Sequence, residues 1–76
     1  MPKNLTRENL ISFLIQIRKE AGMTQDQVAN ALGKPQSFVS KYENGERNLD
    51  FIEVIDVIEV LGLDPATKIS KLISSQ

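Results

Sequence analysis

Apolar residues recur along most of this chain at spacings of three and four positions, the repeat of a helix that buries one face. Each apolar segment but the last is followed by a glycine, at positions 22, 33, 45 and 62. Glycine adopts the left-handed conformation that closes a helix at little cost, so these positions predict helix ends. No stretch alternates apolar and polar residues over a useful length, so no strand is predicted. The pattern indicates an all-α fold.

Capping residues divide the chain into five predicted helices. Thr24 and Asp50 stand three residues before Gln27 and Glu53, which is the spacing of a capping box. Pro65 has the fixed backbone angle of a first helical turn. The five predicted helices form a compact bundle, and they extend over Thr6 to about Ala21, Thr24 to Gly33, roughly Gln36 to Asn44, Asp50 to Gly62, and Pro65 to about Ser74.

Two short apolar stripes in the middle of the chain predict a pair of packed helices. Val28 and Ala29 lie on one face of the second predicted helix, and Val39 and Tyr42 lie on one face of the third. Two short helices that cross need a small residue at the crossing and a positive-φ residue at the turn. Ala29 and Gly33 meet these needs, so residues 24–44 are predicted to form two crossed helices joined by a tight turn.

Composition restricts the chemistry. The 76 residues are 41% hydrophobic and 25% charged, which is ordinary for one globular domain, and we assign residues 1–76 to it. Cysteine and histidine are absent, which excludes disulfides, Cys/His zinc sites and a Ser-His-Asp triad. The four glycines are all assigned to helix ends, so none remains for a phosphate-binding loop. We expect a protein that is not an enzyme, with no catalytic residue, metal site or cofactor.

The sequence also predicts a location. The start, MPKNLTREN, has no apolar stretch behind a basic residue, so we expect no signal peptide. The longest apolar-rich run, residues 51–63, is interrupted by acids and is too short to span a bilayer. We therefore expect a cytoplasmic protein with no membrane partner.

The distribution of charge matters more than its total. A net charge of −1 argues weakly against nucleic-acid binding, because phosphate contacts need Lys and Arg. However, residues 1–23 carry +2, residues 24–47 carry zero, and residues 48–76 carry −3. The acidity lies on and beside the fourth predicted helix. The remainder of the chain is mildly basic, which keeps DNA as a candidate ligand.

The segment TQDQVANALGKPQSFVSKYENGERNLD resembles the helix-turn-helix of the Xre/Cro family, which includes phage Cro and repressor proteins and many small bacterial regulators. The resemblance extends over roughly residues 10–64. No matching residue is specific alone, but together they form a strong motif: Arg18, Gly22, Thr24, Gln25, Ala29, Gly33, Val39, Glu43, Asn44 and Gly45. The resemblance implies a lambda-repressor-like DNA-binding fold. Pro35 departs from the family pattern, because it replaces the usual Ser or Thr cap and cannot cap with a side chain.

In this family the third helix enters the major groove, and its N-terminal residues contact base edges. Carried over by position, the resemblance implies base contacts from Gln36, Ser37, Phe38, Ser40 and Lys41. Glutamine is a bidentate partner for adenine, and lysine suits guanine. We place Phe38 on the side of the helix away from Val39 and Tyr42, where its ring contacts a thymine methyl or a protein partner. The alternative for the polar residues is a solvated surface helix.

The resemblance also implies contacts with the DNA backbone and a structural ion pair. Residues in the loop after the third helix and at the start of the second match the family's phosphate contacts. These residues are Thr24, Gln25, Asn44, Arg47 and Asn48. Arg18 and Glu43 match a charged pair that joins the first helix to the third, and we interpret this pair as structural.

The fourth and fifth predicted helices carry more apolar surface than one core needs. We expect Phe51 to face the core together with Val54 and Ile58. A second apolar set on residues 50–74 is either covered within the chain or forms a homodimer interface. This set comprises Ile52, Val57, Val60, Ile69, Leu72 and Ile73.

These observations predict a DNA-binding transcriptional regulator, a homodimer on a palindromic operator of double-stranded DNA. The sequence does not say whether it blocks or recruits polymerase. The alternative is a protein-binding module, an antitoxin or antirepressor that uses the same fold for a protein partner. The acidic fourth helix and the additional apolar surface favour that alternative.

Overall fold

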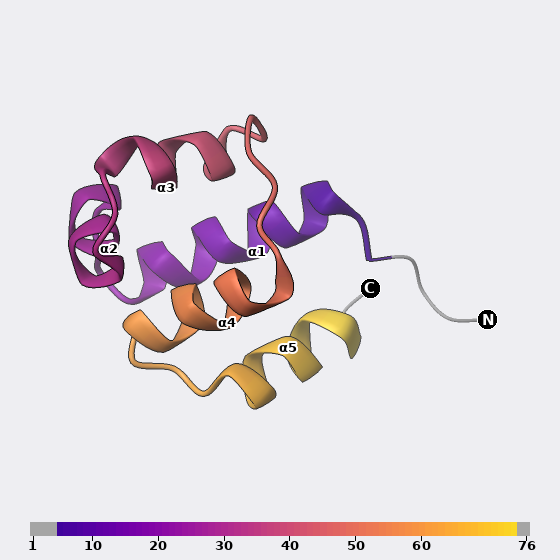
Figure 1. Ribbon diagram of the computed structural model, residues 1–76. Coiled ribbons are helices and arrows are strands. Elements are labelled where there is room, and N and C mark those ends of the chain that lie inside the picture. The colour runs from indigo at the N-terminus through magenta and orange to yellow at the C-terminus, as the bar shows by residue number, and fades with distance from the viewer. Residues whose placement is uncertain (1–4, 75–76) are drawn as a thin grey trace.

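The computed structural model describes residues 5–74 and forms five α-helices in this range, with no strand (Figure 1). The helices are α1 (Arg7–Glu20), α2 (Gln25–Leu32), α3 (Gln36–Glu43), α4 (Phe51–Val60) and α5 (Pro65–Ser74). The predicted all-α class and the five predicted helices are confirmed.

The predicted caps and helix ends are present. The Thr24 hydroxyl accepts a hydrogen bond from the backbone N–H of Gln27 at 3.1 Å, and the side-chain oxygen of Gln27 accepts one from the backbone N–H of Thr24 at 2.8 Å. Asp50 and Glu53 form a second capping box at the start of α4. The four glycines have φ between 69° and 79°, in the left-handed region that favours glycine. Pro35 makes no side-chain cap, and α3 begins at the residue after it.

The arrangement of the helices sets α3 apart from α4 and α5. α1 passes through the middle of the molecule, with α3 on one side of it and α4 and α5 on the other (Figure 1). α2 packs against both α3 and α4, α3 also packs against α1, and α5 packs against α4. In this view α2 is seen almost along its axis while α3 lies across the picture, so the two helices cross. One side of α3 is therefore left uncovered.

The core joins α1, α2, α3 and α4. Val28, Val39 and Ile58 have no exposed surface, and Tyr42 is also buried. Phe51 is 68% exposed, so the expectation that it faces the core is wrong. Phe51 is the first residue of α4 and stands three positions before the first buried residue of that helix, Val54. The buried stripe of the helix begins one turn later, and its members are Val54, Val57, Ile58 and Leu61.

Across residues 5–74, no helix combines the length and apolar character needed to cross a membrane.

Candidate nucleic-acid interface

The turn between α2 and α3 is built from backbone hydrogen bonds around Gly33. The amide of Gly33, at φ 69°, donates to the carbonyl of Asn30, and the Lys34 amide donates to the carbonyl of Ala29 at 2.9 Å. These bonds satisfy carbonyls at the end of α2, as in a helix closed by a left-handed residue. Pro35 then leads directly into α3. The turn is therefore short and fixed, and α3 crosses α2 with its inner face on the core.

The opposite face of α3 carries most of the predicted base contacts. Gln36, Ser37 and Lys41 are exposed, and Ser40 is half-buried. Positions 36, 37, 40 and 41 share one side of a helix, because residues three and four apart are neighbours. Val39 and Tyr42 are buried on the other side. The predicted polar set therefore lies together on a single outward surface.

Phe38 does not belong to this surface, and its expected position away from Tyr42 is wrong. Its ring meets the Tyr42 ring edge to face, with 5.7 Å between the centroids. The guanidinium of Arg47 lies 4.6 Å from the Phe38 ring centroid, and the Lys34 ammonium lies 5.6 Å from it. The reason is helical spacing, since residues four apart share a face. Phe38 is half-buried against the core, so we assign it no base contact.

A largely buried ion pair joins α1 to α3. The Arg18 guanidinium binds both carboxylate oxygens of Glu43, at 2.7 and 3.1 Å, and donates to the Met23 carbonyl at 2.8 Å. The two side chains are 11% and 5% exposed. The hydrogen bond to Glu43 raises the pKa of Arg18 above its ordinary value. This geometry fits the structural role predicted for the pair: the contacts of Arg18 fix the end of α3 relative to α1 and the α1–α2 turn.

Two further hydrogen bonds extend from this ion pair to the start of α3. The Gln25 amide nitrogen donates to Glu43 Oε1 at 2.8 Å, and the Gln36 amide nitrogen donates to Gln25 Oε1 at 2.7 Å. We name the chain of side chains Arg18, Glu43, Gln25 and Gln36 the amide relay. Sequence reasoning missed it, because Gln25 and Gln36 are eleven positions apart on different helices and share no periodic pattern. Only the crossing of α2 and α3 brings them together.

The loop from Asn44 to Asn48 is held from both sides. Arg47 pairs with Glu53 through two hydrogen bonds of 3.1 and 3.0 Å and donates to the Asn48 carbonyl at 2.8 Å. The pKa of Glu53 is lowered, first by its hydrogen bond from Arg47 and then by the Asp50 amide. Asn44 and Asn48 are exposed at the two ends of the loop. The predicted backbone contacts of this loop are therefore presented on an anchored segment.

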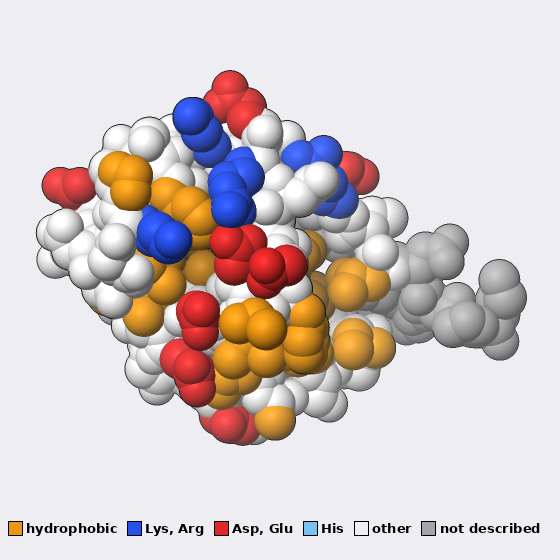
Figure 2. Space-filling model, in the orientation of Figure 1, with side chains coloured by type: hydrophobic (Ala, Val, Ile, Leu, Met, Phe, Trp, Pro, Cys, Tyr) orange, Lys and Arg blue, Asp and Glu red, His pale blue; other side chains and the backbone are white. Residues whose placement is uncertain are grey.

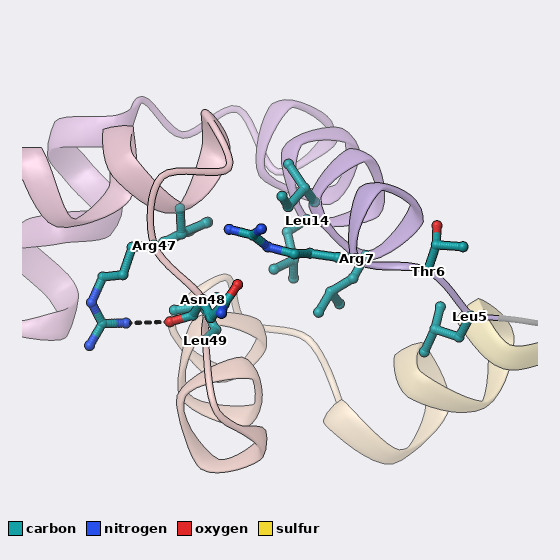
Figure 3. Close-up of a pocket in the computed structure, with 10 residues that line it drawn as sticks. Leu5, Thr6, Arg7, Leu14, Arg47, Asn48 and Leu49 are labelled. Atoms are coloured by element: carbon teal, nitrogen blue, oxygen red, sulfur yellow. Dashed lines mark hydrogen bonds between the residues drawn. The ribbon is translucent and has the colours of Figure 1, made fainter.

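Besides the ion pair with Glu53 of α4, the loop has a contact with α1. Arg7 extends from the start of α1 toward the loop (Figure 3) and donates to the carbonyl of Gly45. A cavity of about 260 Å³ lies here, mostly apolar in its lining. Its walls include Leu5, Leu10, Ile11, Leu14, Tyr42 and Leu49. Arg7 thus connects α1 to the segment that carries the predicted phosphate contacts.

Charge is separated across the surface. Figure 2 shows most of the visible Lys and Arg side chains over the region of α3 and the following loop, with some Asp and Glu side chains among them, and a band of Asp and Glu side chains along the region of α4. The acidic side chains of α4 include Asp56 and Glu59, which are exposed. Residues 5–74 contain no cluster of three or more side chains suited to a metal ion. The visible Lys and Arg side chains therefore gather on the side where α3 is uncovered.

The predicted dimer residues divide into two groups. Ile52 and Ile73 are 69% and 56% exposed, and Val60 and Ile69 are half-buried. Val57 and Leu72 are 1% and 3% exposed, so their assignment to an interface is wrong. Val57 lies three residues after Val54 on the core stripe of α4, and Leu72 belongs to the inner face of α5.

Two crossed helices joined by a fixed turn, with a polar outward face on the second of them, define a helix-turn-helix DNA-binding protein of the transcription-regulator class. The comparisons agree: a family model described as helix-turn-helix matches residues 14–68. The chain belongs to the XRE family of helix-turn-helix regulators.

Solved structures give the same result. An XRE-family-like protein from Pseudomonas syringae pv. tomato is 46% identical, with a TM-score of 0.86 over 92% of this chain and 85% of that one. The regulator ClgR of the clp genes in Corynebacterium glutamicum is 26% identical, with a TM-score of 0.77 over 97% of this chain and 95% of that one. The restriction-modification controller protein C.Esp1396I is 22% identical, with a TM-score of 0.82 over 95% of each chain, and shares the fold. No curated protein matches the sequence.

Proposed function

We propose that this regulator binds double-stranded DNA as a homodimer, with α3 of each copy in the major groove of one half of a palindromic operator. The half-sites would lie about 34 Å apart, one turn of the double helix. Gln36, Ser37, Ser40 and Lys41 contact bases. Thr24, Gln25, Asn44, Arg47 and Asn48 contact the phosphate backbone.

The observation that carries this proposal is the uncovered polar face of α3. An outward helix face in a globular domain is commonly polar, but this one begins at a fixed turn and lies where Lys and Arg side chains gather, on a protein with a net charge of −1. Phosphate neutralisation requires basic side chains near the groove. Lys41 lies on α3, Lys34 precedes the helix and Arg47 follows it. The neighbour C.Esp1396I has been solved as a tetramer with its natural 35 base-pair operator, which shows that this fold is compatible with DNA binding by several copies.

The homodimer is supported by the exposed apolar residues of α4 and α5. Ile52, Phe51 and Ile73 are each more than half exposed. Large apolar side chains gathered on one face are typical of an interaction surface. A two-fold interface on this side would leave α3 of each copy free on the opposite side, as a palindrome requires.

Selection from random double-stranded DNA with the purified protein, at near-physiological salt, tests the proposal. Recovery of a palindrome is the expected result and gives the class, symmetry and half-site together. Binding should also weaken steeply with salt: six to ten phosphate contacts correspond to a loss of roughly 10³–10⁵ in affinity between about 50 and 200 mM. A flat salt response or no enriched sequence would contradict it.

Substitutions on α3 test the base contacts. Gln36→Ala should weaken the free energy of operator binding by about 1–3 kcal/mol and reduce the base preference at one position of the operator. Lys41→Ala should weaken operator binding, while Lys71→Ala, the same loss of charge on the distant helix α5, should change it little. If both α3 variants fold and keep wild-type operator affinity, the groove assignment is wrong.

A second candidate function is binding to a basic protein partner through α4, as in an antitoxin or antirepressor. The band of exposed acids beside exposed isoleucines favours it. Co-purification of a basic partner that is lost in a variant with Asp56→Asn and Glu59→Gln, while DNA selection recovers nothing, would establish this function in place of the first.

A further inference from the structure

The amide relay has a direction, which is set by the carboxylate of Glu43. An ionised carboxylate only accepts hydrogen bonds, and this one already accepts two from Arg18. The side chain is 5% exposed, so water has little access to it. Whatever else contacts Glu43 must therefore donate.

This requirement passes from one side chain to the next. The side-chain nitrogen of Gln25 donates to Glu43 Oε1 at 2.8 Å. In the reversed orientation, the side-chain oxygen of Gln25 would face the carboxylate oxygen, and two acceptors form no hydrogen bond. Gln25 then presents its carbonyl oxygen to Gln36, and Gln36 must meet it with a nitrogen, at 2.7 Å. Among the described residues no other side chain bonds to the Gln36 amide. Its oxygen and its second N–H are left for a ligand.

We propose that Glu43 is a positioning residue for base recognition: by fixing the amide of Gln25, it fixes which way the Gln36 amide faces the DNA. The inference rests on the proposed function, in which Gln36 contacts a base edge. The free amide oxygen and N–H of Gln36 match the donor and acceptor of adenine, N6 and N7. Because their order in space is fixed, adenine is accepted on one strand, and the reversed T·A pair is refused.

Base preference at the pair contacted by Gln36 is the quantity that tests this role. We would measure affinity for the selected operator and for operators in which single A·T pairs are reversed, using the full chain. The Gln36→Ala variant identifies the contacted pair as the one where preference disappears. In the wild type, reversal of that pair should weaken binding by about 5- to 160-fold, the range for one bidentate contact.

The Glu43→Gln variant has nearly the same volume but can donate as well as accept, so the direction of the relay is lost. Its preference at that one pair should fall to less than about threefold, while preferences at the other pairs remain. Gln25→Met, which leaves the Arg18–Glu43 pair intact, should give the same result. Glu53→Gln breaks an ion pair of similar geometry that is not connected to Gln36, and it should keep the wild-type preference. Thermal unfolding by circular dichroism sets a temperature at which every variant is folded.

A measurement without DNA separates positioning from base contact. In side-chain amide spectra from nuclear magnetic resonance, one proton of the Gln36 NH₂ group, the one bonded to Gln25 Oε1, should exchange with water more slowly than the other in the wild type and in Glu53→Gln. This difference between the two protons should be lost in Glu43→Gln and Gln25→Met.

The possible failures are distinguishable. If Gln36→Ala keeps every preference, the base contact is wrong and the positioning role falls with it. If Gln36→Ala loses the preference but Glu43→Gln and Gln25→Met keep it, the base contact stands and the positioning role is refuted. If Glu43→Gln weakens the base preference equally at all pairs and Gln25→Met has no effect on it, Glu43 has only a structural role and the positioning role is refuted.

Discussion

Ile58 and Ile52 lie on the same helix and differ almost only in burial, which makes them a matched pair. Ile58 has no exposed surface and Ile52 is 69% exposed. Both lie within α4, so Ile→Ala changes helix propensity by the same few tenths of a kcal/mol at each position. A difference in stability between Ile58→Ala and Ile52→Ala therefore measures burial.

The expected magnitude follows from the structure. Ile58→Ala removes about three methylene-sized groups from the core, and at about 0.8 kcal/mol each their transfer is worth about 2.4 kcal/mol. The cavity left among rigid neighbours adds to this, and measured values for such changes are about 2–5 kcal/mol. A chain of this length is typically stable by roughly 4–11 kcal/mol, so the variant loses a large part of its stability. Ile52→Ala should change the unfolding free energy by less than about 0.5 kcal/mol.

Urea unfolding followed by far-ultraviolet circular dichroism measures both variants, at a protein concentration low enough for monomers. Equal losses in the two variants would refute the burial that places α4 in the core. Repeating the measurement at high protein concentration adds a test of the homodimer. If Ile52 lies in the interface, Ile52→Ala should then lower the free energy of unfolding by more than it does at low concentration, because dissociation of the dimer is part of unfolding.

Four other predictions concern the cap of α2, the turn at Gly33, and the titration of Glu53 and of Tyr42. Thr24→Ala removes the capping box of α2 and should cost about 1 kcal/mol of unfolding free energy, with Thr24→Ser close to wild type; equal stability of the two variants would contradict this. Gly33→Ala should lower the free energy of unfolding by about 1 kcal/mol, because alanine is strained at a φ of 69° even though no atom lies within 4 Å of the added Cβ. Urea unfolding that shows no loss of stability would contradict this strain. Because Arg47 lowers the pKa of Glu53, the folded state binds fewer protons than the unfolded state around the ordinary Glu pKa of about 4.3, so stability is lost as pH falls through the acid range. Glu53→Gln should flatten this part of the pH profile, and an unchanged acid slope would contradict the assignment. Burial raises the pKa of Tyr42, so the folded state retains a proton that the unfolded state releases, and stability should fall again above about pH 10.

Local chemistry accounts for what sequence alone predicted correctly. The caps at Thr24 and Asp50 bond to amides only three residues away, and the glycines act through their own backbone angles. Such interactions do not depend on the rest of the fold, so they are legible in the sequence. The outward polar face of α3 follows from the same helical spacing that buries Val39 and Tyr42.

Interactions between helices decided the remainder. The apolar residues of α4 are all suited to a core by composition, yet neighbouring helices bury Val57 and leave Phe51 and Ile52 exposed. The Phe38–Tyr42 contact, by contrast, follows from the four-residue spacing within α3 and was open to prediction, and only the Arg47 contact comes from beyond the helix.

The sequence by itself determined five helices, their ends, and a helix-turn-helix with polar residues on the exposed side of α3, because each of these rests on bonds or spacings within a few residues. The tertiary structure alone decided that Glu43, Gln25 and Gln36 form one hydrogen-bonded chain. These side chains come from two helices that meet only when they cross, and hydrogen bonds need atoms within about 3 Å, a condition that a sequence pattern does not encode.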